Sequence, residues 1–295
     1  MSEDLVAADI RIAKTLPSKF YTDEAKFNTL LSVFEGWQFA AHSSEHQSNS
    51  ILPLEHIEAI TGEPVVLVKG HETRCLSNIC THRGMRLVSN PCSKTTLQCE
   101  YHGRTFDLEG NLKHMPEFEQ AIGFPTESDN LHQFEITNWK GLNFVCKERA
   151  EQFSWEQLDE RFDFLDIESY SHDSSRDRDH TINANWMLYV DNYLEGFHIP
   201  FVHPELNQSL DYSGYTTKVL DGGVLQIGRA SDVELTKACA GSILDTVEIQ
   251  DQNIIEQVQK SMFSSVYDRG RYSPTSEQGV HHFHRMISGF YSGIS

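Results

Sequence analysis

The sequence predicts an α+β chain in which a small all-β domain precedes a larger domain of helices and strands. Short strand-like segments, separated by Gly, Pro and Asn turns, run from Trp37 to about Cys146. Beyond them, helical spacing of apolar residues dominates, most clearly over 253–267. We therefore expect a helical lead-in over residues 1–36, a β domain over 37–147 and a mixed domain over 148–295.

Composition excludes several classes of protein. The 295 residues contain 24 Lys+Arg against 43 Asp+Glu, which gives a formal net charge of −19 and argues against a nucleic-acid partner. No apolar run is long enough for a transmembrane helix, and the acidic N-terminus does not resemble a signal peptide. The expectation is a cytoplasmic protein without a membrane partner.

Each expected element follows from a local pattern. The segments EPVVLVKG, TTLQCEY, TFDLEG and KGLNFVC predict strands, as does GGVLQIGRA further on. RAEQFSWEQLDERF predicts a polar helical linker, and residues 166–186 are expected to lead as a strand into the next helix. The segment NIIEQVQKSMFSSVY is expected to form the C-terminal helix.

The cysteines indicate a metal centre in the β domain. Four of the six cysteines cluster among histidines, and two C/H pairs stand out: Cys80-x-His82 and Cys99-x2-His102. Finger-type zinc sites pair like ligands, whereas each of these pairs joins one thiolate to one imidazole. That arrangement suits a Rieske [2Fe–2S] centre, in which one iron takes both cysteines and the other both histidines.

The flanking residues support this interpretation. NICTHRGMRL and CEYHGRTFDLEGNL resemble the Rieske domain of ring-hydroxylating oxygenases. Gly84 and Gly103 would let the backbone turn close to the cluster. Arg104 stands where many relatives have Trp. The extra loop cysteines of respiratory Rieske proteins are missing, which disfavours that class.

A second motif follows in NANWMLYVDNYLEGFHIPFVHPEL. Asp191, Glu195 and His198 are expected on one face of a helix that Pro200 ends, with His203 on the following turn. Two histidines and a carboxylate can form the facial triad of non-haem Fe(II) oxygenases. The alternative is an amphipathic helix with two incidental histidines.

The pattern D-N-x2-E-x2-H-x4-H is similar to the catalytic motif of Rieske oxygenase α subunits. The resemblance implies that His198 and His203 bind iron and that Asp191 and Asn192 belong to the catalytic set. It also implies that Glu195 bridges to a Rieske histidine across a subunit interface. Glu at this position looks most like the choline- and carnitine-type monooxygenases.

The third iron ligand is expected further along the chain. VEIQDQNIIEQVQKSM is similar to the family's C-terminal helix, which the ligand opens, so Asp251 is chosen and Asp245 is the reserve. An acid in the first turn of a helix also has a purely structural explanation. The remaining candidates are Asp211, Asp221, Asp232 and Asp268. His281, His282 and His284 are interpreted as packing and surface residues.

The resemblance implies a Rieske domain joined to a helix-grip (START-like) antiparallel-sheet catalytic domain, on which the N-terminal lead-in packs. It implies one [2Fe–2S] cluster and one mononuclear Fe(II), with NAD(P)H acting only through a flavin/iron–sulfur reductase or a ferredoxin. O2 would then be used to hydroxylate or oxidatively dealkylate a small aromatic or quaternary-ammonium substrate. A homotrimer is expected, because cluster and iron within one chain would be too far apart.

The catalytic domain is expected to be shortened. Only 47 residues separate His203 from Asp251, and 204–250 hold few aromatics, whereas the family has several strands there. The apparent join lies near Glu234–Gly241. Either a compact variant rebuilds the site, or the chain is an electron-transfer or regulatory Rieske protein with a degenerate catalytic domain.

Overall fold

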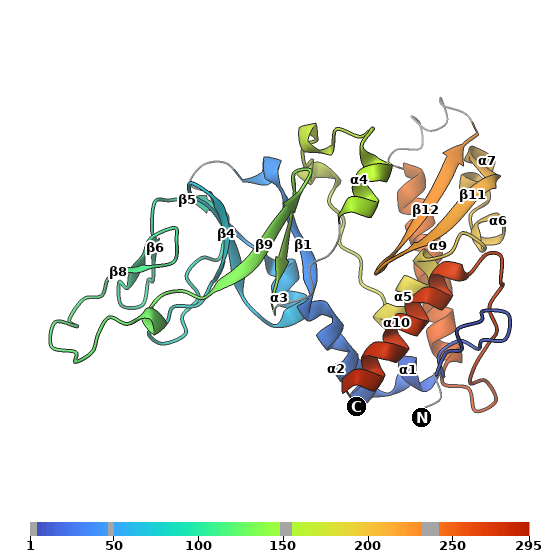
Figure 1. Ribbon diagram of the computed structural model, residues 1–295, viewed down its shortest axis with the longest axis horizontal. Coiled ribbons are helices and arrows are strands. Elements are labelled where there is room, and N and C mark those ends of the chain that lie inside the picture. Colours follow the sequence, from blue (N-terminus) through green and yellow to red (C-terminus); the bar gives the residue numbers. More distant parts are fainter. Residues whose placement is uncertain (1–4, 47–49, 148–154, 232–241, 295) are drawn as a thin grey trace. The chain divides into compact units, whose positions relative to one another are not determined.

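The structure is a computed structural model that describes residues 5–46, 50–147, 155–231 and 242–294 (Figure 1). The chain forms two compact units, one of Leu31–Asp177 and one of Met1–Leu30 with Arg178–Ser295. No helix among the described residues combines the length and apolar character that a membrane span needs.

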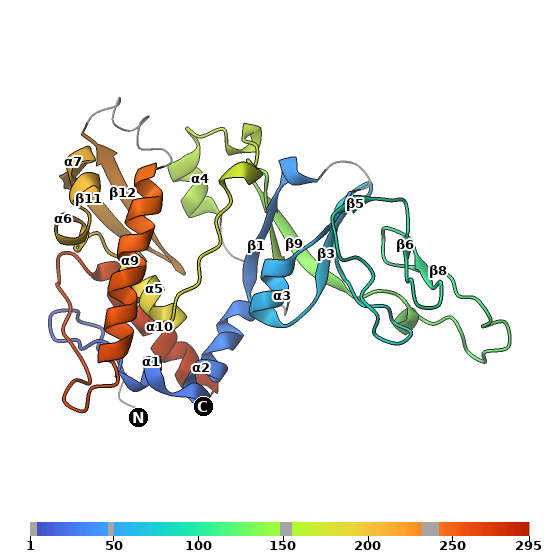
Figure 2. The ribbon, with the colours of Figure 1, turned by 180° about the vertical axis from the view of Figure 1, so that it is seen from behind.

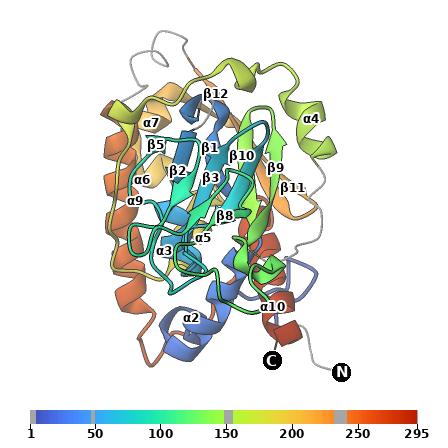
Figure 3. The same cartoon turned by 90° about the vertical axis from the view of Figure 1, so that its left-hand side faces the viewer.

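The Leu31–Asp177 unit is built on a seven-stranded antiparallel sheet with strand order β1-β10-β9-β4-β3-β2-β5. Several of these strands are labelled in Figure 3. Strands β3 and β4 pair with Val66 opposite Leu76, and both side chains are fully buried. Residues 65–68 of β3 are all buried and contribute in turn to two apolar clusters, so both faces of this strand are covered. The strands are β1 Trp37–His42, β2 Ser50–Pro53, β3 Val65–Lys69, β4 Thr73–Ser77, β5 Cys92–Ser93, β9 Gln133–Trp139 and β10 Leu142–Cys146.

A smaller three-stranded sheet, β6-β7-β8, carries one of the cysteine–histidine pairs. Leu97 and Phe106, opposite each other on β6 and β7, share a buried core with Val66 and Leu76 of the large sheet. The small strands are β6 Leu97–Gln98, β7 Thr105–Phe106 and β8 Leu112–His114. The helices of this unit are η1 Leu31–Glu35, η2 Ser43–Glu45, α3 Glu55–Thr61, η3 Glu127–Asp129, α4 Glu156–Phe162, η4 Ile167–Ser169 and η5 Ser174–Arg176.

The second unit packs helices around an antiparallel hairpin (Figure 2). Helix α9 lies against α5, and α10 lies against β11. Met187, Ile255 and Ile287 of the three helices meet in one buried core. The elements are α1 Lys19–Thr22, α2 Glu24–Leu30, α5 Trp186–Tyr193, α6 Ile199–Val202, α7 Pro204–Ser209, β11 Leu210–Leu220, β12 Gly223–Ala230, α9 Ser242–Ser261 and α10 Gln278–Ile294.

The strands expected from 63–70, 95–101, 105–110, 140–146 and 222–230 are confirmed in position, although several are shorter. The linker helix is confirmed over Glu156–Phe162. Within the described residues the second unit has a two-stranded sheet, which alone is marginally stable and depends on the helices packed on it. The expected join at Glu234–Gly241 lies outside the described residues.

Three structural expectations are wrong. Residues 166–186 contain the short helices η4 and η5 in place of a strand, in keeping with their many Asp and Ser residues. Helix α9 begins well before Asp251 and ends at Ser261, so this aspartate lies in mid-helix and the macrodipole does not explain it. The last helix of the chain is α10, which contains His284.

The helix expected through His198 is also wrong. Helix α5 ends at Tyr193, and the carboxylate of Glu195 accepts hydrogen bonds from the backbone N–H groups of Phe197 and His198. This local side-chain-to-backbone bonding competes with helix continuation. Pro200 lies in the first turn of α6, a position where proline starts a helix well.

Candidate metal centres

The two cysteine–histidine loops of the β unit are built alike. In each, the cysteine N–H donates to the carbonyl five residues on at 2.8 Å, and the cysteine carbonyl accepts from the glycine four residues on at 3.0 Å. Gly84 has φ 70° and Gly103 has φ 75°, which a residue with a Cβ adopts at a cost. Each loop therefore folds back and presents its cysteine and its histidine on one side.

The loops bring Cys80, His82, Cys99 and His102 together. Both cysteines are buried free thiols, and the two imidazole rings have centroids 4.8 Å apart. The Nδ1 atom of each histidine is buried without a hydrogen-bond partner in the described chain. Unpaired buried nitrogens beside two thiols fit a metal cluster that takes two thiolates and two imidazoles.

The surroundings of His82 favour its metal-binding form. Burial lowers the pKa of His82, and electrostatic interactions with His102, Arg104 and Arg83 lower it further, which favours the neutral imidazole. By contrast, burial raises the pKa of Cys75, outside the loops, to about 12. That thiol stays protonated and packs in the core of the large sheet.

A second candidate centre lies in the helical unit. Ligand atoms of His198, His203 and Asp251 all lie within 4.8 Å of one another. The Nε2 atoms of His203 and His198 are 3.0 and 3.5 Å from Oδ1 of Asp251. His198 precedes α6, His203 joins α6 to α7 and Asp251 comes from α9, so three segments converge. Two imidazoles and one carboxylate suit non-haem Fe(II).

Both histidines are fixed through their other nitrogen. Nδ1 of His198 lies 2.6 Å from Oε1 of Glu195, and Nδ1 of His203 lies 2.7 Å from Oε1 of Gln250. Such hydrogen bonds set the tautomer and orientation of metal-binding imidazoles, leaving Nε2 for the metal. Gln250 was not anticipated from the sequence; its only signal is that it precedes Asp251.

Negative charge surrounds this second centre. Burial lowers the pKa of His198, but the hydrogen bond to Glu195 and the charges of Glu195 and Asp251 outweigh it, so the pKa lies above its usual value. The same fields that favour an imidazolium favour a bound cation. The residues present therefore fit a divalent metal ion.

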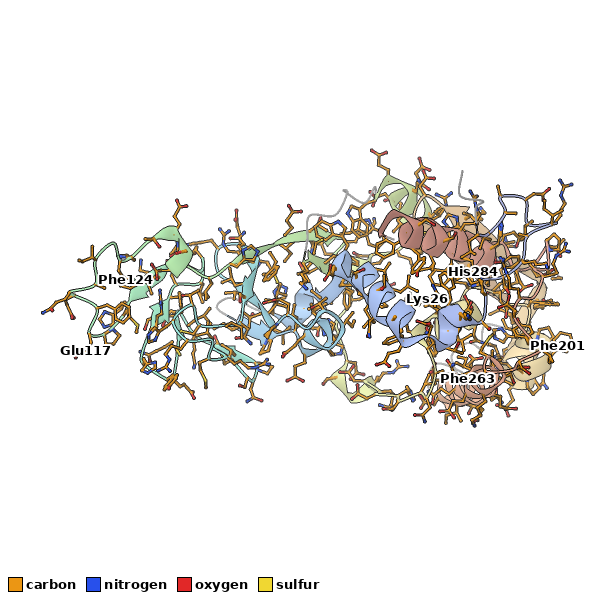
Figure 4. The ribbon with its side chains drawn as sticks, turned by 90° about the horizontal axis from the view of Figure 1, so that it is seen from below. Lys26, Glu117, Phe124, Phe201, Phe263 and His284 are labelled. Carbon is orange, nitrogen blue, oxygen red and sulfur yellow. The ribbon has the colours of Figure 1, made fainter. Side chains whose placement is uncertain are left out.

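The remaining expected residues lie close by. Asp191 accepts hydrogen bonds from the hydroxyl of Tyr21 at 2.8 Å and from Nε2 of the buried His284 at 2.8 Å. His284 is labelled in Figure 4. His284 is thus a packing residue that also holds Asp191. Asn192 and Glu195 line a cavity of about 250 Å³, and the bridging role of Glu195 stays a prediction.

The other aspartates lie away from this group. Asp245 is exposed on α9, and Asp211, Asp221 and Asp268 are exposed as well, whereas Asp232 lies outside the described residues. Among the described residues, Asp251 is the aspartate that meets the two histidines.

Family models match both units of the chain. The Rieske [2Fe–2S] domain matches residues 36–135, and the catalytic domain of the ring-hydroxylating α subunit matches 163–219 and 226–293. The chain therefore joins a Rieske [2Fe–2S] domain to a catalytic domain of the ring-hydroxylating α-subunit family, which confirms the resemblance and the expected fold class.

Among its relatives are two monooxygenases. The carnitine monooxygenase oxygenase subunit of Escherichia coli K12 is 32% identical over 231 residues, covering 75% of this chain and 61% of that protein. The chloroplastic choline monooxygenase of Beta vulgaris is 22% identical over 352 residues, covering 92% of this chain and 76% of that protein. The crystal structure of the quaternary ammonium Rieske monooxygenase CntA with an inhibitor has a TM-score of 0.83 at 22% identity, covering 98% of both chains.

The lengths of the alignments show that these relatives contain residues without a counterpart in this chain. The alignment with the choline monooxygenase runs over 352 positions, more than the 295 residues of the chain, so that relative contains segments without a counterpart here. The chain spans only 61% of the length of the carnitine monooxygenase subunit.

Proposed function

We propose that the chain is the oxygenase component of a Rieske monooxygenase that hydroxylates or oxidatively dealkylates a small quaternary-ammonium substrate. The observation that carries this proposal is the convergence of His198, His203 and Asp251, whose ligand atoms lie within 4.8 Å of one another. When bound, the [2Fe–2S] cluster supplies single electrons and the mononuclear iron supplies the site of O2 reduction. In this proposal Cys80, His82, Cys99 and His102 hold the cluster.

The chain's own residues hold the second site ready for a metal. Glu195 and Gln250 fix the two imidazoles through Nδ1, at 2.6 and 2.7 Å, so that both Nε2 atoms face Asp251. Because these contacts use Nδ1 and leave Nε2 for the metal, they can persist when a metal binds. Asn192 lines the adjoining cavity and is placed to contact substrate or water.

The substrate class follows from the charge of that cavity. Asp191, Glu195 and Glu277 all line it, together with His198. Burial raises the pKa of Glu277, and the charges of Glu195 and Asp191 raise it further, whereas a cation would relieve this repulsion. A quaternary ammonium group is therefore favoured over an aromatic carboxylate, in keeping with the names of the carnitine and choline monooxygenases.

Electron supply requires partners. In this proposal a flavin/iron–sulfur reductase or a ferredoxin with a basic docking face delivers electrons to the acidic chain. Glu195 would connect the iron site to a Rieske histidine of a neighbouring copy in a homotrimer. Inter-subunit electron transfer is described for CntA, whose solved structures share the fold of this chain.

We also propose domain boundaries at 36/37 and 147/148. The Rieske family match begins at residue 36, and the catalytic match begins at 163. Residues 5–30 belong to the same compact unit as 178–294, which supports a lead-in that packs on the catalytic domain.

A second candidate function is an electron-transfer or regulatory Rieske protein without oxygenase activity. The two-stranded sheet among the described residues and the long unmatched segments of the choline monooxygenase favour it. The two candidates differ in one respect that can be measured, the presence of the mononuclear iron.

The deciding experiment is iron and acid-labile sulfide analysis of anaerobically purified protein, with EPR of the reduced form. An oxygenase should hold about three iron and two sulfide per chain, and His198→Ala should lose one iron and keep the Rieske signal. His180→Ala, at an exposed histidine of the same unit, is the matched control. Two iron and two sulfide in the wild type would favour the electron carrier.

For an iron-replete protein, turnover with a reductase tests the substrate class. Carnitine and choline should be consumed with formation of an aldehyde or a hydroxylated product, and benzoate should not. Preference for benzoate would contradict the proposed substrate, while leaving the iron site intact.

A further inference from the structure

Arg104 is a buried charge beside the Rieske loops. Its side chain is 2% exposed, among the largest fully buried side chains of the described chain. The guanidinium carbon lies 5.8 Å from the ring centre of Phe106 and 5.5 Å from that of Phe124, which is labelled in Figure 4. Arginine is rarely buried without a specific partner for its charge.

Asp129 accepts only part of the hydrogen bonds that this guanidinium group can donate. Nη2 of Arg104 donates to the carboxylate of Asp129 at 2.6 Å and to its backbone carbonyl at 3.2 Å. Nε of Arg104, however, is buried and has no acceptor among the described residues. Because a buried donor without an acceptor is costly, this N–H points to a partner that the polypeptide does not supply.

The hairpin places Arg104 next to a cluster cysteine. Gln98 pairs with Thr105, and one step further the N–H of Cys99 donates to the carbonyl of Arg104 at 2.8 Å. Residues opposite each other in an antiparallel pair project their side chains to the same face. The guanidinium and the thiol of Cys99 therefore lie on one side of the hairpin.

The same ion pair also reaches the first loop. Thr81, between Cys80 and His82, donates its hydroxyl to the backbone carbonyl of Asp129 at 2.7 Å. Asp129 thus receives hydrogen bonds from both loops, one through Thr81 and one through Arg104. This arrangement fixes Arg104 relative to all four proposed cluster ligands.

We infer that Arg104 is a positioning residue for the [2Fe–2S] cluster, donating its Nε–H to a cluster sulfur and stabilising the reduced state with its charge. One electron from the reductase adds one negative charge to the cluster, and a buried cation favours that change. The carboxylate of Asp129, at 20% exposure, opposes it. The inference rests on the cluster assignment of the proposed function.

The test is a redox titration of the purified holoprotein, followed by EPR and visible absorption. In Arg104→Gln, the ratio of reduced to oxidised cluster at a given potential should fall about tenfold, a shift of ~59 mV to more negative potential. Arg104→Lys keeps the positive charge, so the reduction potential should shift less than in Arg104→Gln. Asp129→Asn removes the opposing charge and should shift the potential in the positive direction.

Arg74→Gln is the matched control, because Arg74 lies on β4 of the same unit and pairs with Glu72. The reduction potential of the cluster in Arg74→Gln should equal that in the wild type. If the Arg104–Asp129 pair were purely structural, the reduction potential of the cluster would shift in the same direction in Arg104→Gln and in Asp129→Asn. That result would overturn the inference. So would an unchanged potential in Arg104→Gln.

Two further outcomes are also decisive. If Arg104→Gln fails to assemble a cluster, the test rests on Asp129→Asn. A reduction potential of Asp129→Asn that is not higher than that of the wild type then overturns the inference. A wild-type protein without any Rieske signal contradicts the proposed function and the inference together. A normal signal with unchanged potentials contradicts the inference alone.

Discussion

Truncation of Gln250 should weaken iron binding although Gln250 is not a proposed ligand. Its Oε1 lies 2.7 Å from Nδ1 of His203, a histidine that is 1% exposed. In Gln250→Ala this Nδ1–H loses its acceptor inside the protein, and the ring is free to turn its Nε2 away from Asp251. The change therefore acts on both stability and metal affinity.

The size of both effects follows from the burial of His203. A buried donor left unpaired costs about 1–3 kcal/mol of the free energy of unfolding. Loss of a hydrogen bond that orients a metal-binding histidine lowers metal affinity by roughly 10–100-fold. That loss corresponds to about 1.4–2.7 kcal/mol of binding free energy.

Competition between the protein and a chelator of known Fe(II) affinity measures the second effect, and urea unfolding measures the first. Gln257→Ala is the control, because Gln257 is exposed on the same helix and its side chain donates to the backbone carbonyl of Asn253, away from the two histidines. Gln250→Glu offers a carboxylate acceptor and should restore affinity. An Fe(II) affinity of Gln250→Ala equal to that of Gln257→Ala would refute the reasoning.

Three more predictions concern pH, packing and metal removal. The hydrogen bond to Asp177 raises the pKa of His172 in the folded protein. The protonated imidazole therefore stabilises the fold at pH values below the unfolded pKa of about 6.5. This stabilisation is lost as the pH rises through the higher pKa of the folded state. His172→Asn should therefore lower Tm more at roughly pH 6 than at pH 9; equal losses would contradict this. A Cβ on Gly196 would lie 2.5 Å from the ring of Tyr215, so Gly196→Ala should lower Tm and iron content, unlike Gly223→Ala, which meets nothing within 4 Å. Fe(II) at a hundredfold excess over its Kd should stabilise the protein by about 2.7 kcal/mol, and a chelator should remove that gain in urea unfolding.

The close approach of the two cysteine–histidine loops could be predicted from the sequence because the geometry of each loop is local. Each cysteine–histidine pair lies within one tight turn, and the glycine four residues after the cysteine has positive φ, as Gly84 and Gly103 show. Spacing alone therefore determines which side chains can meet. Packing of apolar side chains from β3, β4 and β6 in one buried core then brings the two turns together.

The helical site was harder to predict because it depends on tertiary contacts. The spacing of His198 and His203 was informative, but Asp251 comes from a separate helix and rested on the family resemblance. The expected continuous helix failed at Glu195, whose carboxylate bonds to backbone N–H groups that a helix would have used. Gln250 was missed because nothing in its local sequence shows which histidine it will meet.

The two candidate centres leave opposite nitrogens of their histidines available for a metal, and this difference reflects how each site is built. In the Rieske loops Nδ1 of His82 and His102 is buried and has no hydrogen-bond partner among the described residues, whereas in the helical site Nδ1 of His198 and His203 lies within hydrogen-bond distance of Glu195 and Gln250. A tight loop holds the ring by its backbone and leaves the nitrogen nearest the backbone for the metal. Where separate segments converge, each imidazole ring extends away from its own backbone. A neighbouring side chain must therefore orient the ring through Nδ1 so that Nε2 can bind a metal. Loss of sheet strands should therefore weaken the second centre first, because its orientation depends on side chains of other elements.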